Sequence, residues 1–303
     1  MRIARVFHDS QVRLGVVADD GVRLLPGSPS LVDWLERDPR GLAASVRQVA
    51  SSQADCVPLN EVRFLAPVDR FRRDVLCTGW NYYDHFTESI GKREGQEVER
   101  PKAPAFFTKS PDVVIGPTDP IAFDARISKK WDYEAEVAVI IGKAGRSIPA
   151  RQAMDHVWGY CLANDVSQRD LQRRHGGQWL KGKSLDGTMP LGPWVVTADE
   201  VDLPAVRLKC LLNGQVMQDA YARQMVLTVP ELVAELSLGM TLRPGDVLLT
   251  GTPSGIGNAR NPPVFLKAGD ELVVQATGLG ELRNRLESVD LYGESSVALD
   301  WPD

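Results

Sequence analysis

The sequence contains few of the residues that build disulfide frameworks or soft-metal sites. Its 303 residues include only four cysteines and four histidines. The cysteines lie far apart, at Cys56, Cys77, Cys161 and Cys210, and the absence of a Cys-x-x-Cys pair argues against a zinc knuckle or a disulfide framework. The histidines show no His-x-His or His-x-x-x-His spacing, which argues against a histidine-rich site. A metal site in this chain must therefore rely on oxygen ligands.

The chain also lacks an excess of basic charge and any long apolar run. Its net charge is −5 and its pI is about 5.5, so it has no electrostatic footprint for nucleic acid or for an anionic membrane surface. No run approaches the roughly eighteen apolar residues of a membrane span. Residues 1–10 carry charges where a signal peptide needs an apolar stretch. We expect a cytoplasmic protein, with 43% hydrophobic residues to form a large core and a small molecule as its partner.

Short apolar runs separated by many glycines and prolines predict the fold. Residues 1–66 are interpreted as a small N-terminal α/β domain of short strands and helices, with a boundary at Pro67. In residues 67–303 strand patterns dominate, and Asn213-Gly214 between two alternating runs predicts a hairpin. Helices are expected only near 82–92, 150–157, 167–174 and 229–240. The expected fold class is mainly β with peripheral helices (α+β), not a doubly wound sheet.

The segment GQWLKGKS, residues 177–184, matches the P-loop pattern G-x-x-x-x-G-K-S. That pattern binds phosphate only where a strand runs into the glycines and a helix starts at the lysine. Here the preceding residues are polar and helix-like, and the next ten residues contain two glycines and two prolines. The sequence therefore argues against a nucleotide site, and the segment needs another explanation.

Two acidic residues interrupt the apolar run WDYEAEVAVIIGK, residues 131–143. In a strand Glu134 and Glu136 share one face, and both faces become apolar within two residues. Two like charges about 7 Å apart in a partly buried setting need compensation. A cation between them is one interpretation, and a solvated strand end or a pair that shares one proton are the others.

A third acid, Asp165, follows the apolar run that ends at Asn164, and Ser167 is expected to cap a short helix just after it. With Glu134 and Glu136 it would complete an all-oxygen site for Mg²⁺ or Mn²⁺, with Ca²⁺ as a further option. Alone, Asp165 is equally well explained as a capping or turn carboxylate.

Four motifs in this order resemble the catalytic domain of the fumarylacetoacetate hydrolase superfamily: YEAEVAVIIGK, GYCLANDVSQRDLQ, WLKGKSLDGTMPLGPWVVT and LLTGTPSGIG. Within the superfamily the chain is similar to acylpyruvate hydrolases and 2-hydroxyhepta-2,4-diene-1,7-dioate isomerases. The resemblance covers about residues 70–285 and implies a mixed β-sandwich roll, a homodimer, and a divalent cation on Glu134, Glu136 and Asp165. Members cleave, decarboxylate or isomerise 2-keto acids.

The resemblance also assigns catalytic roles. Lys183, in the segment that mimics a P-loop, is expected to face the substrate and to stabilise an enolate. His85 and Glu88 are three residues apart, so on a helix the carboxylate can orient the imidazole. Without the resemblance His85 would be interpreted as a packing residue. The charged stretch 91–102 is expected to be part of a lid, or else only a mobile loop.

Five residues are expected to contact substrate: Tyr82, Lys109, Arg169, Gln172 and Thr252. Trp80 stands where some relatives place an arginine. The main functional expectation is a divalent-metal-dependent hydrolase that cleaves an acylpyruvate-type 2,4-diketo acid to pyruvate and a carboxylic acid, with His85 activating water. The alternative is a decarboxylase or keto–enol isomerase of a hydroxymuconate-type diacid or oxaloacetate. A metabolite-binding protein without turnover is the remaining alternative.

Overall fold

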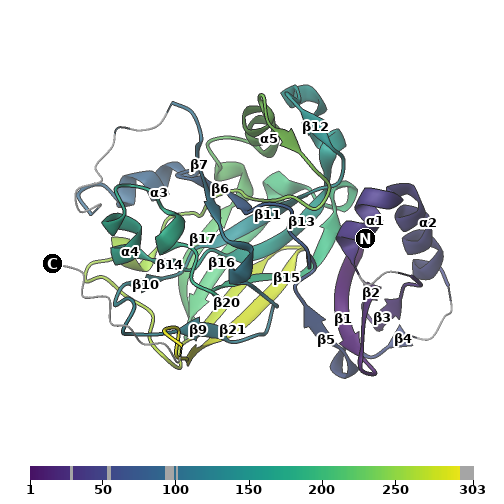
Figure 1. Cartoon of the computed structure of the whole chain (residues 1–303), viewed down its shortest axis with the longest axis horizontal. Helices are drawn as coiled ribbons and strands as arrows, with labels where there is room; N and C mark the ends of the chain where they lie inside the picture. Colours follow the sequence, from purple (N-terminus) through teal and green to yellow (C-terminus); the bar gives the residue numbers. More distant parts are fainter. Residues whose placement is uncertain (28–29, 53–55, 93–98, 100–101, 294–303) are drawn as a thin grey trace.

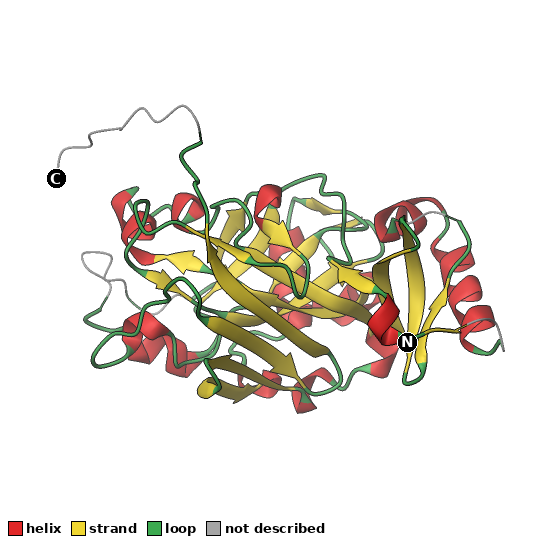
Figure 2. Ribbon diagram, turned by 90° about the horizontal axis from the view of Figure 1, so that it is seen from below, coloured by secondary structure: helices red, strands yellow, loops and turns green. Residues whose placement is uncertain are grey.

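We analysed a computed structural model of the chain, which describes residues 1–27, 30–52, 56–92, 99 and 102–293 (Figure 1). Most of the expected lid segment 91–102 falls outside these residues. Strands dominate the described part and short helices lie around them (Figure 2). This confirms the predicted mainly β fold with peripheral helices.

The N-terminal region is an antiparallel meander followed by two helices, at one end of the molecule (Figure 1). Both helices begin at side-chain caps: the Ser30 hydroxyl accepts from the Asp33 amide, and the Asp38 carboxylate accepts from the Gly41 amide. The elements are β1 (Arg2–His8), β2 (Gln11–Ala18), β3 (Gly21–Leu24), α1 (Leu31–Arg37), α2 (Pro39–Ala50), β4 (Cys56–Val57) and β5 (Arg63–Leu65).

One large sheet joins this region to the rest of the chain. Its strand order is β4-β3-β2-β1-β15-β13-β11-β19-β6-β7, with β5 beside β1 and β8 beside β15. The link is the antiparallel pair of β1 with β15, in which Arg2 lies opposite Val196. The further strands are β6 (Val75–Gly79), β7 (Ala105–Lys109), β8 (Val114–Ile115), β11 (Ala135–Ile141), β13 (Val157–Asn164), β15 (Met189–Thr197) and β19 (Val247–Leu249).

A second sheet has the order β17-β16-β20-β21-β9 and packs against the first. Its hairpin turn confirms the prediction at Asn213-Gly214, since both residues have positive φ, 49° and 81°. Its strands are β9 (Ile121–Phe123), β16 (Arg207–Leu212), β17 (Gln215–Tyr221), β20 (Glu271–Ala276) and β21 (Gly280–Ser288). Two small ladders add β10 (Trp131–Asp132) with β14 (Ser167–Gln168), and β12 (Gly145–Arg146) with β18 (Thr241–Leu242).

Few helices lie outside the N-terminal region. α5 (Val229–Ser237) starts at a capping box in which Glu231 accepts from the Thr228 amide at 2.7 Å. α3 (Tyr83–Glu88) and α4 (Arg169–Arg174) are short and lie on the side of the molecule opposite the N-terminal region (Figure 1). Residues 150–157 form a 3₁₀ helix, Ala150–His156, rather than an α-helix. Further 3₁₀ turns are Leu59–Glu61, Pro111–Val113, Leu180–Gly182, Ala198–Glu200, Leu203–Ala205, Ala222–Gln224 and Gly257–Ala259.

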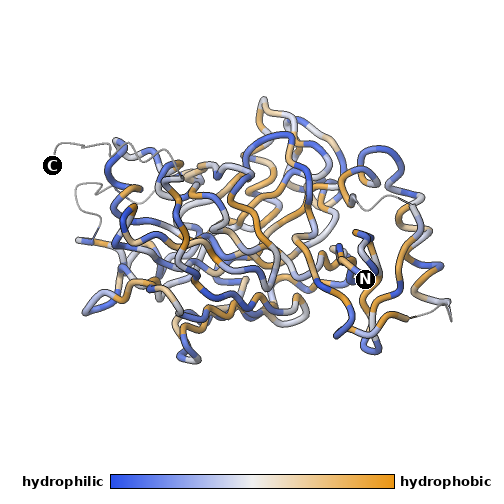
Figure 3. The backbone as a smooth tube through the Cα atoms, turned by 60° about the horizontal axis from the view of Figure 1, so that its bottom comes forward, coloured by the Kyte–Doolittle hydropathy of each residue, from blue (hydrophilic) through white to orange (hydrophobic). Residues whose placement is uncertain are grey.

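The apolar core fills the space between and beside the sheets, where hydrophobic segments of the central strands lie inside the molecule (Figure 3). Every residue of β11 is buried. This strand is therefore covered on both faces, and it brings the acidic residues at its start into the interior.

Candidate active site

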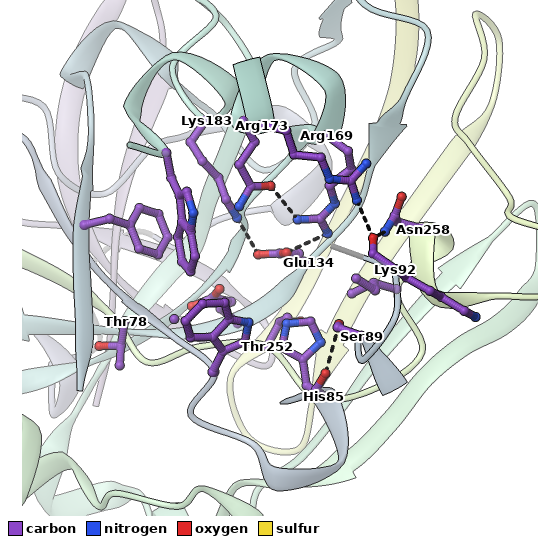
Figure 4. Close-up of a pocket in the computed structure, with 17 residues that line it drawn as sticks. Thr78, His85, Ser89, Lys92, Glu134, Arg169, Arg173, Lys183, Thr252 and Asn258 are labelled. Atoms are coloured by element: carbon purple, nitrogen blue, oxygen red, sulfur yellow. Dashed lines mark hydrogen bonds and ion pairs between the residues drawn. The ribbon is translucent and has the colours of Figure 1, made fainter. Parts of the chain in front are cut away.

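A cavity opens beside the start of β11. Its wall comes from the end of β6, from α3 and α4, from Trp179 and Lys183 on either side of a 3₁₀ turn, and from the loop after β19. Figure 4 shows its side chains, with Glu134 and Lys183 on one side and His85 on another.

The three predicted acids meet at the base of this cavity. Glu134 precedes β11, Glu136 lies within it, and Asp165 follows β13. The two strands pair with Ala135 opposite Asn164, and the Asp165 amide donates to the Glu134 carbonyl at 2.8 Å. One carboxylate oxygen from each acid lies within 4.8 Å of those of the other two. All three residues are buried, so the interpretation of a solvated strand end is wrong.

Asp165 does not cap a helix or a turn through its side chain. Its two carboxylate oxygens contact the ammonium groups of Lys109 at 2.6 Å and Lys183 at 2.8 Å. The prediction that Ser167 caps a helix is also wrong. Ser167 lies in β14, and its hydroxyl donates to the Asp165 carbonyl, because pairing with β10 extends the backbone there.

Lys183 reaches the centre of the acidic cluster. Its Nζ donates to Glu134 Oε2 at 2.6 Å and to Asp165 Oδ2 at 2.8 Å (Figure 4 marks the first contact). Burial alone would lower the pKa of Lys183, but the charges of Asp165 and Glu134 raise it above its usual value. Lys183 is therefore a buried, charged ammonium group in the wall of the cavity.

The two glutamates have different electrostatic surroundings. Burial alone would raise the pKa of Glu134, but the charges of Lys183 and Arg169 hold it below its usual value. Burial and the charges of Asp165 and Glu134 raise the pKa of Glu136 well above its usual value. The Glu136 carboxylate accepts a hydrogen bond from the Gly251 amide at 2.6 Å. Glu136 is thus the least compensated acid of the cluster.

The cluster fits a divalent cation. Four buried carboxylates (Asp132, Glu134, Glu136, Asp165) lie in one network with three buried cations (Lys109, Arg169, Lys183). With all four carboxylates ionised the network carries one negative charge more than its cations balance, and the set of three convergent carboxylate oxygens is one that hard cations such as Mg²⁺, Mn²⁺ and Ca²⁺ favour.

His85 and Glu88 form the predicted pair. Both belong to α3, and His85 Nδ1 lies 3.0 Å from Glu88 Oε1. The other carboxylate oxygen of Glu88 accepts from the Gly255 amide at 2.7 Å, which ties α3 to the loop after β19. Since the carboxylate favours a proton on Nδ1, Nε2 of the neutral ring is the free acceptor. His85 lines the cavity.

Arg169 and Gln172, which were predicted to contact substrate, line the cavity and contact each other, with Arg169 Nη1 3.1 Å from Gln172 Oε1. Arg169 is held by two acids: Nη2 lies 2.6 Å from Glu134, and Nε donates to Asp132 at 2.9 Å. Its position is therefore fixed before any substrate binds.

Asp132 is a positioning residue that the sequence interpretation missed. Besides Arg169, its carboxylate accepts from the amides of Gly257 and Asn258, at 2.7 and 3.0 Å. It thereby connects β10, α4 and the loop that holds Asn258 at the cavity. The alternation Asp132-x-Glu134-x-Glu136 was the signal that could have identified it.

Of the other predicted substrate contacts, Lys109 and Tyr82 do not line the cavity and Thr252 does. Lys109 is fully buried behind Asp165, donates to the Val166 carbonyl at 3.1 Å, and does not line the cavity. Tyr82 is also buried and does not line the cavity. Thr252 lines the cavity, but its hydroxyl donates to the Ala135 carbonyl and accepts from Gln218, so its bonds position the loop.

The structure explains the segment that mimics a P-loop. No strand leads into Gly177 and no helix starts at Lys183, because residues 180–182 form a 3₁₀ turn and β15 starts only at Met189. A Cβ atom at Gly182 would lie 2.2 Å from the Gln172 backbone nitrogen, so this glycine allows the turn to pack against α4. The turn places Lys183 in the acidic cluster.

Comparisons with known proteins agree with this geometry. Residues 74–287 match the family model described as fumarylacetoacetate (FAA) hydrolase, C-terminal. The chain belongs to the fumarylacetoacetate hydrolase family. Residues 1–67 match a second model, Rv2993c-like, N-terminal. No helix among the described residues is long and apolar enough to cross a membrane.

Individual family members extend the comparison. The chain is 43% identical to the mitochondrial oxaloacetate tautomerase Fahd2a of Rattus norvegicus, over 85% of this chain and 79% of that protein. It is 41% identical to the oxaloacetate tautomerase YisK of Bacillus subtilis, over 75% and 74%. A solved structure of a fumarylacetoacetate hydrolase from Exiguobacterium antarcticum has a TM-score of 0.82 and 36% identity, over 95% of this chain and all of that one.

Proposed function

We propose that this enzyme of the fumarylacetoacetate hydrolase family is a divalent-metal-dependent tautomerase, which interconverts the keto and enol forms of oxaloacetate or a closely similar 2-oxo dicarboxylate. Two relatives, from a mammal and a bacterium, carry this activity in their names. The alternative of keto–enol isomerisation is thus better supported than the main expectation of C–C hydrolysis. The observation that carries the proposal is an oriented imidazole on the same cavity as a charged lysine and three convergent carboxylates.

Glu134, Glu136 and Asp165 would hold the cation. When bound, a divalent cation would supply Lewis-acid polarisation of the 2-oxo group and an anchor for the neighbouring carboxylate. The identity of the ion, Mg²⁺ or Mn²⁺, stays part of the proposal.

His85 moves the proton. Its Nε2 accepts a proton from C3 of the keto form. The electron pair of the broken C–H bond forms the C2–C3 double bond while the carbonyl π pair moves to the 2-oxo oxygen, and the imidazolium then gives the proton to that oxygen. The net reaction moves one proton from carbon to oxygen and needs no water or other reactant. Glu88 keeps the imidazole in the required tautomer. The charge of Lys183 stabilises the developing enolate oxygen.

The cavity suits a substrate with two carboxylates. Arg169, Arg173 and Lys183 all line it, so that a second carboxylate finds cationic groups in the same cavity (Figure 4). Arg173 is oriented by a bond to the Lys92 carbonyl at 2.8 Å. A simple acylpyruvate has one carboxylate and would use fewer of these charges.

Exchange of the C3 protons of oxaloacetate in heavy water tests the proposal. With Mg²⁺ present, NMR should record loss of the C3 signal well above the spontaneous rate, and the His85→Ala variant should return the rate close to that background. Exchange by the unmodified enzyme at only the spontaneous rate would exclude this function.

Acylpyruvate hydrolysis is the second candidate, because His85 with Glu88 could equally orient and deprotonate a water. We further propose, from the family resemblance, that the enzyme is a homodimer. Light scattering coupled to size-exclusion chromatography checks this, and the mass of a single chain would contradict it.

A further inference from the structure

A second cavity lies next to the catalytic one, and Trp80 stands between them. The walls of both cavities include Thr78, Gly79 and Trp80. The second cavity is larger, about 410 Å³ against about 70 Å³. Its other walls combine apolar side chains, among them Phe86, Val226 and Leu227, with the polar ones of Asn81, Tyr83 and Lys102. Val226 is 41% exposed, so this cavity reaches solvent.

The backbone holds Trp80 in an unusual conformation. Its φ is 54°, in the left-handed region that a bulky residue rarely adopts. On the preceding side Gly79 is paired in β6 opposite Ala105. On the following side Asn81 Nδ2 donates to the carbonyls of Leu227 and Thr250, at 3.0 and 2.9 Å. Both neighbours are fixed, so the turn that presents the indole is built into the fold.

The indole is also held by rings on both sides. Its centroid lies 4.8 Å from that of Trp179 and 5.9 Å from that of Phe86, both in edge-on packing. Trp179 lines the catalytic cavity, and Phe86 lines the second one. A Cβ atom at Gly79 would lie 2.5 Å from the Trp179 ring, so glycine there leaves room for this packing. Trp80 is thus a fixed partition with one aromatic contact in each cavity wall.

We propose that Trp80 determines specificity by setting the length of the substrate. It closes the catalytic cavity toward the second one and restricts the site to short acids such as the substrate in the function proposed above, on which this inference rests. Without the indole the two cavities join, and the aliphatic tail of a longer 2-oxo acid can extend between Phe86, Val226 and Leu227.

Affinities for 2-oxobutanoate and 2-oxooctanoate test the proposal, because neither acid contains an acyl group that the enzyme could remove. Calorimetry with saturating Mg²⁺ should find that the unmodified enzyme prefers the short acid. Trp80→Gly, which suits a positive φ, should shift the affinity ratio toward the long acid by about tenfold or more, since several methylene groups become buried. Trp80→Asn, which also tolerates this φ, is the second variant if the first does not fold.

A second substitution identifies where the tail lies. Adding Val226→Trp to Trp80→Gly fills the second cavity without changing the walls of the first, and should remove the gain for the long acid. An unchanged affinity ratio in the folded Trp80 variants, or a gain that survives Val226→Trp, would overturn the proposal. If oxaloacetate exchange stays at the spontaneous rate but the affinity ratio shifts in the Trp80 variants, the tautomerase function is rejected and the role of Trp80 remains supported.

Discussion

The unequal surroundings of Glu134 and Glu136 predict that the same isosteric change has opposite effects at the two positions. In metal-free protein Glu136→Gln removes a buried charge that is 1% exposed and that repels two acids nearby. At a separation of 4.8 Å or less and an effective dielectric constant of about 20, each like-charge pair repels by about 3 kcal/mol or more. Protonation of Glu136 in the unmodified protein already relieves part of this repulsion. We therefore expect Glu136→Gln to raise the unfolding free energy by about 1–3 kcal/mol.

Glu134→Gln is the matched control. Glu134 contacts both Lys183 and Arg169 at 2.6 Å, so its loss leaves two buried cations with one acidic partner fewer. Each cation keeps another carboxylate, which limits the expected loss to about 2–3 kcal/mol.

Thermal and denaturant unfolding with and without Mg²⁺ measure both effects. Metal-free Glu136→Gln should melt about 2–6 °C above the unmodified enzyme, and Glu134→Gln should melt below it. At one hundred times the dissociation constant, Mg²⁺ should stabilise the unmodified enzyme by about 2.7 kcal/mol, but Glu136→Gln much less. Equal destabilisation by the two variants, or a full response of Glu136→Gln to Mg²⁺, would refute the charge balance described here.

The stability gain also has a defined pH dependence. The folded-state pKa of Glu136 lies well above the usual value of 4.5, so metal-free enzyme retains a proton that the unfolded chain loses. Unmodified enzyme therefore loses stability relative to Glu136→Gln as the pH rises above about 4.5. The difference in unfolding free energy between the two proteins should be small at lower pH and should grow as the pH rises. A difference that shrinks as the pH rises would contradict the raised pKa of Glu136.

Three further predictions concern catalysis and metal uptake. His85→Ala should lower the rate of oxaloacetate exchange by about 10²–10⁴-fold and leave the affinity for Mg²⁺ nearly unchanged, and Glu88→Gln should lower the rate less. Loss of Mg²⁺ binding in His85→Ala would instead make His85 a binding residue. Because Mg²⁺ binds the ionised form of Glu136, the affinity of the enzyme for Mg²⁺ should rise with pH, and binding should release a proton. Calorimetry in buffers of different ionisation enthalpy measures this release, and its absence would contradict the raised pKa of Glu136. Asp132→Asn should raise KM for oxaloacetate more than it lowers kcat, since it loosens Arg169; an unchanged KM would remove its positioning role.

Local patterns in the sequence predicted the features that local physics controls. Asn213-Gly214 forms its hairpin because both residues tolerate positive φ. His85 and Glu88 meet because three residues span less than one helical turn. The segment around Lys183 could be rejected as a P-loop because the strand and helix that the pattern needs were missing from the sequence itself.

Features that depend on the pairing of segments far apart in the chain were harder to predict from the sequence. The pair of β1 with β15 brings Arg2 opposite Val196, far apart in the chain, and no local pattern indicates that the N-terminal strands extend the large sheet. Ser167 had a capping pattern, but pairing with Asp132 placed it in a strand. Lys109 was predicted to contact substrate, but its ammonium group is buried against the Asp165 carboxylate.

The depth of the acidic cluster was underestimated for the same reason. Spacing indicates that Glu134 and Glu136 share a face, but only the neighbouring strands decide that both are buried. The proposed role of Trp80 in specificity depends on two cavities that form from segments far apart in the chain. The positive φ of Trp80 could not be predicted either, because tryptophan is not a residue type that favours it.

The most direct test of the proposed function compares two reactions on one preparation with Mg²⁺. One assay follows the decay of enol absorbance in freshly dissolved oxaloacetate, and the other follows pyruvate release from acetylpyruvate. The account predicts rapid, His85-dependent tautomerisation of oxaloacetate with little pyruvate release. Efficient pyruvate release, with oxaloacetate relaxing at its spontaneous rate, would contradict it and favour the hydrolase.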